Sequence, residues 1–507
     1  MILIAGVIGS LIAVFSLGYM EAFQKEHRDV RDRRNFFFFI LFLFLSAMFG
    51  LVVSNNLLYM YTFWEITSVC SFLLIGYTES RVAVNNSFKA LWMNLLGGVA
   101  FAAAIIVMGL TYHSTALSHL VGLALAGMPV TVILALLLLC GFTKSAMMPF
   151  SGWLLGAMVA PTPTSALLHS STMVKAGVFL IIKLCPALGN NHAGTMAMFV
   201  GGITFFFASC AAISQSDGKK VLAYSTISNL GLIVCCAGIG SYEAAWTAIM
   251  IVIFHAVAKS LLFLSVGTAE QQLGSRDIER FDGLFNAMPH LCLCMVIGIS
   301  GMFLAPFGML ISKWAAMKAF IDAGHPMLLL LLVFGSATTI FYWAKWLGKI
   351  LSVMNGQERR EQGITQGEWF TLKTLSWMTI IVCILFPLIS SYGVLPYLRI
   401  TYGFTRDVIA QSNLIIMSLM VVLLVILPSR YGKGQPKRKV GALLAGVNTG
   451  DDRNYRGAGD NIIPVELRNW YMEEWFGEKK MKLSGFALCM ACIFIQFAII
   501  LGGVYRG

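Results

Sequence analysis

Long, continuous apolar runs separated by short polar stretches fill the chain from Ile2 to Val504. Each run approaches the roughly 20 residues that a helix needs to cross a bilayer. Strands of a membrane barrel would instead alternate apolar and polar residues over short segments. The predicted fold class is therefore an all-α polytopic membrane protein. The runs predict about fourteen transmembrane helices, at residues 2–20, 36–53, 55–77, 87–110, 129–156, 164–186, 195–213, 221–239, 243–268, 289–320, 326–352, 374–396, 408–428 and 484–503.

One long polar segment interrupts this pattern, at about residues 430–483. It divides the chain into a transmembrane bundle over 1–429, a polar excursion over 430–483 and a C-terminal transmembrane helix within 484–507. Gly, Asn and charged residues in the first half of the excursion predict a loop. Aromatic residues between Pro464 and Trp475 predict a short helix at the lipid headgroups.

Lysine and arginine side chains gather in alternate loops of the predicted bundle. By the positive-inside rule, the loops that hold them lie in the cytoplasm. Both termini are then predicted outside, the 430–483 segment in the cytoplasm, and the whole chain in the cell inner (plasma) membrane as a multi-pass protein. The basic residues on this side are Arg28, Arg31, Arg33, Arg34, Arg81, Lys219, Lys220, Arg276, Arg280, Arg359, Arg360 and the run at 430–439.

The composition excludes a water-soluble globule, because 58% of the residues are hydrophobic and only 12% are charged. That charged share is about half of the roughly 25% that is usual in soluble proteins. The net charge of +12 would suggest a nucleic-acid partner in a soluble protein. Here much of the excess lies in short loops, and further lysines lie inside apolar helices, so we predict no nucleic acid and a lipid bilayer as the surroundings.

Eleven cysteines lie nearly all within apolar runs, and their spacing gives no set of four ligands. The pair Cys489 and Cys492 could hold half of a metal site, but without a second pair packing is the better interpretation. The phosphate-binding pattern G-x-x-x-x-G-K-S/T is also missing from the sequence. We therefore expect no metal, no iron–sulfur cluster and no other cofactor.

Eight ionisable residues fall inside the predicted helices, where the bilayer penalises charge. A charge at the centre of a transmembrane helix costs about 2.5–3.5 kcal/mol on insertion scales. Eight such residues together predict an internal hydrated route for ions. They are Glu65, Lys144, His169, Lys175, Lys183, His255, Lys259 and Lys313.

Glu65 and Lys144 form the first candidate pair for moving protons. Glu65 stands about ten residues into its helix, too deep for a short side chain to reach the interface. Lys144 stands just before Pro149, where a helix loses a backbone hydrogen bond and its polar groups become accessible. Burial disfavours a charged lysine and a nearby carboxylate favours it, so a contact that forms and breaks would gate proton release. The alternatives are a permanent ion pair for Glu65 and snorkelling to an interface for Lys144.

Two further pairs of titratable residues continue the predicted route. Two prolines one residue apart precede His169 and Lys175, as in the interrupted helices that line transport sites. His255 and Lys259 are four residues apart, so they share one face of a helix and could form a relay. A satisfied packing histidine is the alternative interpretation of His169.

Lys313 repeats the pattern seen at Lys144. It follows Pro306 and Gly308, so it is again a titratable residue beside a helix irregularity. Two similar half-sites suggest an internal repeat.

Several motifs stand in a fixed order along the chain: the helix with Trp64-Glu65, the tracts 144–153 and 161–169, and the segments 217–228 and 255–263. In this order they resemble the antiporter-like subunits shared by respiratory complex I, energy-converting membrane-bound hydrogenases and Mrp-type cation/proton antiporters. The resemblance covers roughly residues 5–350. It implies two inverted five-helix repeats, at about 36–186 and 195–352, each with one broken helix.

The resemblance also implies roles for individual residues. Glu65 would be the pumping glutamate and Lys144 its partner lysine. Lys259 would be the central proton carrier and Lys313 the exit-side lysine. One departure is Ile251, which stands where some members have a second histidine one turn before His255, so the central relay would rest on fewer titratable groups or on water.

The function implied is a proton- or sodium-translocating subunit of a complex I-related, redox-driven membrane complex. Such a complex would be an NADH/quinone oxidoreductase or an energy-converting hydrogenase, and its other membrane subunits would be the partners. The subunit would hold no redox centre of its own. One alternative is an Mrp-like cation/proton antiporter subunit, and another is a scaffold whose charges only form ion pairs. A pump or antiporter needs Glu65, Lys144 and Lys259 to change protonation, whereas a scaffold needs only persistent pairs.

Overall fold

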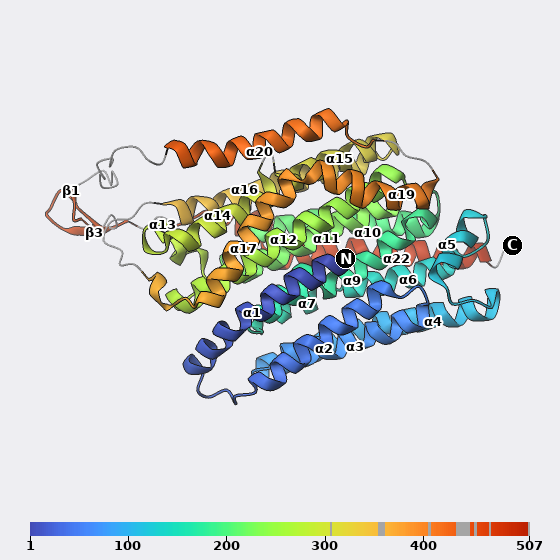
Figure 1. Cartoon of the computed structure of the whole chain (residues 1–507), viewed down its shortest axis with the longest axis horizontal. Coiled ribbons are helices and arrows are strands. Elements are labelled where there is room, and N and C mark those ends of the chain that lie inside the picture. The colour runs from blue at the N-terminus through green and yellow to red at the C-terminus, as the bar shows by residue number, and fades with distance from the viewer. Residues whose placement is uncertain are drawn as a thin grey trace.

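The computed structural model describes residues 1–304, 307–352, 360–403, 407–431, 447–450, 454–465 and 468–504. Its long helices lie side by side along the longest axis of the molecule (Figure 1). A helix satisfies its own backbone hydrogen bonds, which is why continuous apolar sequence forms helices in lipid. Large apolar side chains such as Phe39 and Trp92 lie exposed on the outside of the bundle, as a surface in contact with acyl chains requires.

Eleven helices of the described residues are long and apolar enough to cross a membrane. They are α1 (Ile2–Glu26), α2 (Arg34–Val53), α3 (Leu57–Ile75), α4 (Arg81–Tyr112), the run Thr162–Ala187, α10 (His192–Ile213), α11 (Gly218–Ile239), α12 (Tyr242–Leu273), the run Pro289–Asp322, α16 (Pro326–Leu351) and the run Glu473–Gly503.

A twelfth crossing forms if two helical stretches bent by 66° count as one span. These are α17 (Gln366–Ile384) and the run of α18 (Phe386–Leu388), the π-helix η6 (Ile389–Val394) and α19 (Leu395–Tyr402). Two other predicted spans correspond to shorter apolar helices, α6 (Thr131–Lys144) and the Gln411–Leu424 part of α20 (Gln411–Tyr431). The described residues thus give eleven or twelve crossings by length and composition, against the predicted fourteen.

The structure breaks the predicted helix 129–156, which is not continuous. α6 ends at Lys144, and only α7 (Gly152–Gly156) and the 3-10 turn η1 (Ala157–Val159) follow before residue 160. Pro149 has no N–H to continue a helical ladder, which explains an interruption at this place. The break leaves Lys144 at the C-terminal end of a helix, inside the bundle.

Two more predicted spans consist of several pieces. The run Thr162–Ala187 comprises α8 (Thr162–Ala166), the π-helix η2 (Leu167–Ser171), α9 (Met173–Leu184) and η3 (Cys185–Ala187). The run Pro289–Asp322 comprises α14 (Pro289–Phe303) and α15 (Gly308–Asp322). Pro306, singled out in the sequence, lies outside the described residues. π-Helical turns and helix breaks of this kind recur at functional sites.

Short elements join the long helices at the two ends of the bundle: α5 (Leu117–Leu125), η4 (Ile278–Phe281), α13 (Leu284–Ala287) and η5 (Glu361–Gly363). Two of these joints are alike. Asn56, just before α3, forms an antiparallel bridge with Ala116, and Asp217, just before α11, forms one with Asp277. In both cases a 32-residue helix, α4 or α12, lies between the bridged segments. α5 and α13 mark the two joints at opposite ends of the bundle (Figure 1).

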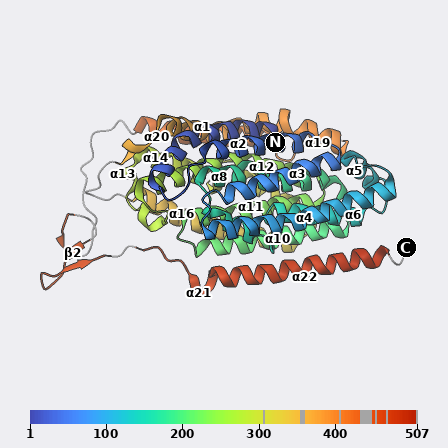
Figure 2. The ribbon, with the colours of Figure 1, turned by 90° about the horizontal axis from the view of Figure 1, so that it is seen from below.

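The polar excursion contains a small antiparallel sheet, so the described residues are not purely helical. β1 (Val447–Asn448) pairs with β2 (Asn454–Arg456), which pairs with β3 (Ile462–Pro464). The predicted headgroup helix is limited to α21 (Glu473–Phe476). The last helix, α22 (Glu478–Val504), starts earlier than predicted and packs along α10 at the edge of the bundle (Figure 2).

Glycines bring α10 and α11 into backbone contact with each other. A Cβ atom added to Gly201 would strike the backbone of Cys235, and one added to Gly231 would strike the backbone of Phe205. Close approach of this kind replaces the hydrophobic drive that helices lack inside lipid. The close contact fixes α10 and α11 relative to each other.

A hydrogen-bonded cluster holds the end of the polar excursion against the bundle. Glu279 of η4 accepts hydrogen bonds from the Tyr471 hydroxyl at 2.5 Å and the Asn469 N–H at 3.2 Å, and it pairs with Lys349 at 2.9 Å. Lys345 lies over the Tyr471 ring at 3.9 Å. Burial by itself would raise the pKa of the Glu279 carboxyl, but these hydrogen bonds and the Lys349 charge outweigh it, so the pKa is lowered.

We expect this attachment to depend on pH. The pKa of the Glu279 carboxyl is lower in the folded protein than in the unfolded chain. The stabilisation that this carboxylate contributes is therefore complete at pH values above its unfolded-state pKa, and it is lost as the pH falls through its folded-state pKa. Hydrogen exchange of residues 468–477, corrected for its intrinsic pH dependence, should therefore accelerate in acid. Glu279→Gln should exchange about tenfold faster already at pH 7, since a hydrogen bond to a charged group is lost. Unchanged exchange in this variant would contradict the assignment. Glu26→Gln, at the C-terminal end of α1, is the matched control.

Candidate functional site

Lys144 lies at the C-terminal end of α6 and is fully buried. Its ammonium donates hydrogen bonds to the Trp64 carbonyl oxygen at 3.0 Å and the Ser68 hydroxyl at 2.7 Å, both on α3. It also lies 5.0 Å from the centre of the Trp64 ring. A cation is favoured at a helix C-terminus by the helix dipole, and no snorkelling to an interface is seen.

Glu65 lies on α3, one residue after Trp64, and is partly buried. Its carboxylate rests against Gly98 of α4, where no side chain competes for the space. Among the described residues no oxygen of Glu65 comes within 4.0 Å of Lys144, and its buried Oε1 atom has no hydrogen-bond partner. The Lys144 ammonium is held by Ser68 and the Trp64 carbonyl, so the Glu65–Lys144 contact, which the sequence predicts to form and break, is not formed in this structure. Glu65 and Lys144 therefore form no direct ion pair in this structure.

His169 lies in the π-helix η2 and is fully buried. Its ring lies 6.1 Å from that of Trp153 and 6.0 Å from that of Phe263. Neither of its ring nitrogens has a hydrogen-bond partner among the described residues. A buried polar group without a protein partner is one that internal water commonly satisfies.

Lys175 and His255 connect the first half of the bundle to the second. The Lys175 amine on α9 lies 2.9 Å from Nδ1 of His255 on α12, and both side chains are fully buried. The other ring nitrogen of His255, Nε2, has no partner among the described residues. A second bridge lies nearby, where the hydroxyls of Ser170 and Ser260 are 2.6 Å apart.

Lys259 shares a helix with His255 but is directed to different partners. Its ammonium donates to the Leu222 carbonyl oxygen on α11 at 3.1 Å and to the Ser225 hydroxyl. It lies 4.9 Å from the centre of the Trp343 ring on α16. Lys259 is thus held as Lys144 is, by a carbonyl, a serine and a tryptophan, although the two lysines are on different helices.

Lys313 on α15 is buried, with 6% of its surface exposed, whereas Lys144, Lys175 and Lys259 are fully buried. It lies 5.6 Å from the centre of the Phe205 ring of α10. No hydrogen bond or ion pair holds its ammonium within the part of the chain that the structure describes. The structure thus brings Lys175 and His255 into direct contact and leaves Lys313 apart from them.

The sequence did not point to the serine, carbonyl and tryptophan partners of the lysines. Ser68 stands three residues after Glu65 and so on the same side of α3, which is a usable signal. Ser225 and Trp343 carry no such signal, because they depend on how α11 and α16 pack. Further buried hydroxyls without partners among the described residues include those of Thr164, Ser165 and Ser265.

The His, Cys, Asp and Glu side chains of the described ranges do not gather into a metal-binding group. No group of three or more His, Cys, Asp or Glu side chains is close enough there to hold an ion. The cysteines are all free.

Comparison with known proteins assigns the chain to a family. Residues 54–339 match the family model described as NADH:quinone oxidoreductase/Mrp antiporter, TM. The Na(+)/H(+) antiporter subunit A1 of Staphylococcus aureus (strain JH9) is 34% identical over 387 residues, which are 71% of this chain and 47% of that protein. The same figures hold for the subunit A1 of strain Newman. The chain spans about half the length of the curated relatives it matches.

Solved structures agree with this assignment. A chain in the structure of the Mrp complex from Dietzia sp. DQ12-45-1b is 27% identical, with a TM-score of 0.71, and the match covers 85% of this chain and 48% of that one. A chain of the membrane-bound sulfane sulfur reductase, an archaeal respiratory membrane complex, is 22% identical with a TM-score of 0.68, and the match covers 83% and 82%. The second likeness shows the fold alone. This chain is a multi-pass membrane protein that belongs to the NADH:quinone oxidoreductase/Mrp antiporter transmembrane family.

Proposed function

We propose that this chain translocates protons, or exchanges protons for sodium, as the antiporter-like subunit of a multi-subunit membrane complex. The observation that carries the proposal is the Lys175–His255 contact at 2.9 Å, fully buried between α9 and α12. Apolar side chains of similar size would stabilise the bundle at least as well as a buried amine beside a buried imidazole. An amine and an imidazole in hydrogen-bond contact can pass a proton from one to the other, which suits a proton relay.

The proposed path runs through the seven titratable residues in order. Glu65 and Lys144 receive the ion, His169 and Lys175 carry it across the first half, and His255, Lys259 and Lys313 take it through the second. The partnerless ring nitrogens of His169 and His255 support internal water between them. In this path the protons move along hydrogen-bonded side chains and water.

Two parent complexes fit this role. One is a redox-driven complex related to complex I, such as an NADH/quinone oxidoreductase or an energy-converting hydrogenase, in which the chain would hold no redox centre. The other is an Mrp-type cation/proton antiporter, which the 34% identity to the Staphylococcus subunit favours. In either complex the remaining membrane subunits are the partners. Identification of the proteins that copurify in mild detergent decides between the two.

We also propose that the bundle is built from two inverted repeats. In this arrangement α2, α3, α4, α6–α7 and α8–α9 correspond to α10, α11, α12, α14–α15 and α16. The matching bridges before α3 and α11, at opposite ends of the bundle, support the inversion. A unit of five crossings ends on the opposite side of the membrane from the side where it begins. A second copy of the unit then starts from that opposite side and is inverted. Counting α6 and α20 as crossings would complete the fourteen proposed spans.

The charge bias gives a proposed orientation in which both termini lie outside and the 430–483 segment is cytoplasmic. In keeping with this, the strands of that segment and the last residues of α22 lie at opposite ends of the bundle (Figure 1). A cysteine placed at Gly450 should react with a membrane-impermeant maleimide only after the cells are opened. Full labelling in intact cells would reverse the orientation.

Gly98 offers a test of Glu65 that leaves its charge in place. A Cβ added at Gly98 would overlap the Glu65 carboxylate, whereas one added at Gly109 of the same helix meets nothing within 4 Å. Gly98→Ala should therefore slow ion translocation about tenfold by displacing the carboxylate, and Gly109→Ala should not. Translocation is measured as ion uptake into liposomes by the reconstituted complex.

A double variant shows whether Gly98→Ala acts through Glu65. In a Glu65→Gln background, Gly98→Ala should cause no further loss, because the two changes remove the same interaction. Additive losses would mean that Gly98→Ala only disturbs packing. Normal transport in Glu65→Gln itself would make Glu65 a structural residue.

A further inference from the structure

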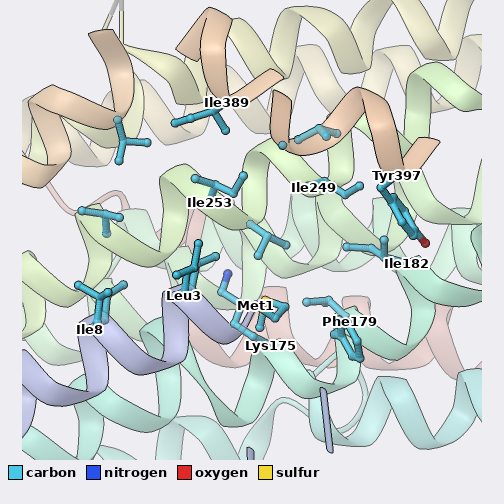
Figure 3. Close-up of a pocket in the computed structure, with 18 of the residues that line it drawn as sticks. Met1, Leu3, Ile8, Lys175, Phe179, Ile182, Ile249, Ile253, Ile389 and Tyr397 are labelled. Atoms are coloured by element: carbon cyan, nitrogen blue, oxygen red, sulfur yellow. The ribbon is translucent and has the colours of Figure 1, made fainter. Parts of the chain in front are cut away.

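An apolar cavity of about 620 Å³ lies between α1, α9, α12, α17, η6 and α19. Figure 3 shows Leu3, Phe179 and Ile253 around it, with Lys175 at its side. Leu3 is 79% exposed, whereas Lys175 is fully buried. The cavity therefore leads from the outer surface of the bundle to the relay. Its volume falls within the range of about 300–1,000 Å³ that is usual for small-molecule sites.

The charged side chains that line this cavity are both lysines. Lys175 and Lys183 stand eight residues apart on α9 and both line it, which separates them by about 12 Å along the helix. None of the described lining residues is acidic. Neither lysine has a carboxylate within 4.0 Å among the described residues. Lys183 lies 5.2 Å from the centre of the Tyr397 ring, and the Lys175 amine contacts His255.

We propose that this cavity binds a long-chain carboxylic acid, with its carboxylate paired to Lys175 and its alkyl chain along the apolar wall. The wall is supplied by Val178 and Phe179 of α9 and by Ile249 and Ile253 of α12. An anionic head matches the two lysines, and the apolar lining matches the chain. Such a molecule would supply the counter-charge that the protein itself does not provide.

A single-chain acid fits this site better than a phospholipid does. A carboxylic acid crosses apolar surroundings in its neutral, protonated form and can ionise beside the amine. A phosphodiester headgroup stays charged, so moving it to a fully buried lysine would carry the cost of a charge inside the membrane. An anionic phospholipid is therefore an alternative outcome of the experiment.

The ligand would act on the proposed relay, and this consequence alone rests on the proposed function. A carboxylate on Lys175 competes with His255 for the amine, so the bound acid would weaken the link between the two halves. Binding itself needs no ion transport. It is therefore measured separately, and failure of the transport proposal would leave the site intact.

The test uses the complex purified in mild detergent and a palmitic acid analogue with a photoreactive diazirine in its chain. Labelled peptides should come from α9, α12 and the η6–α19 segment. Excess palmitate should suppress the labelling, and the methyl ester of the same probe should label about tenfold less, since it cannot form the ion pair. Equal labelling by acid and ester would overturn the proposal.

Two variants and a control complete the experiment. Lys175→Gln should lower labelling about tenfold, and Ile253→Trp should lower it by filling the cavity. Lys313→Gln removes another buried lysine that does not line the cavity, and it should label like the wild type. Wild-type labelling in both Lys175→Gln and Ile253→Trp would overturn the site. Labelling of these helices by a diazirine phosphatidylglycerol, with none by the acid, would overturn the choice of ligand.

Discussion

Replacing Lys144 with glutamine is expected to lower ion translocation by at least about a hundredfold, the usual effect of losing a positioned proton-transfer group. The side chain is fully buried at the end of α6, and its ammonium contacts Ser68 and the Trp64 carbonyl on the helix of Glu65. Glutamine keeps a hydrogen-bond donor of similar size but cannot take up a proton. Assembly should be preserved, because the packing around the position changes little. Ion uptake into liposomes and the subunit composition of the purified complex are the two measurements.

Lys144→Arg separates a proton carrier from a structural cation. Arginine keeps the positive charge and the hydrogen bonds but does not release its proton in proteins. If Lys144 only holds α3 and α6 together, arginine should restore transport. If Lys144 exchanges protons, the arginine variant should be as inactive as the glutamine variant. Lys345→Gln, at the edge of the bundle near Tyr471, is the matched control and should transport normally.

Lys259→Gln is expected to cause a loss of similar size, although it leaves the Lys144 site intact. Lys259 is fully buried and is bound to α11 through Ser225 and the Leu222 carbonyl. If protons cross from the first half through the Lys175–His255 contact, a block at Lys259 stops transport for the whole chain. The same liposome assay measures it, and binding of the partner subunits serves as the control for folding.

A residual activity near one half would contradict this coupling. It would mean that each half forms a channel of its own and that one of them still works. Lys259→Arg again keeps the charge, and it should remain inactive if the group must release a proton.

Much of the architecture could be predicted from continuous apolar runs, because a helix that spans lipid needs about 20 apolar residues in sequence. The run 36–53 and α2 (Arg34–Val53) nearly coincide for this reason. The approach fails where backbone breaks fall inside an apolar run. The end of α6 at Lys144 and the 66° bend after Ile384 leave the hydrophobicity of the sequence unchanged.

The candidate site could be predicted as a set of residues but not as a set of contacts. Titratable residues inside an apolar run are easily recognised, and for this reason Lys175 and His255 can be predicted as site residues from the sequence. Their contact depends on how α9 crosses α12, and a sequence pattern holds no information on that crossing. The Glu65–Lys144 contact, which is expected to form and break, is open in this structure, and the lysine donates instead to Ser68, three residues further along α3.

The most direct test of the account is a structure of the assembled complex in lipid nanodiscs at a resolution that shows ordered water. The account requires a nearly continuous wet path from the Lys144 site to Lys313. It predicts water at hydrogen-bond distance, about 2.7–3.2 Å, from both ring nitrogens of His169 and from Nε2 of His255. Dry apolar packing against those nitrogens, with no room for water between the two histidines, would contradict the lateral path and leave two independent half-channels or none.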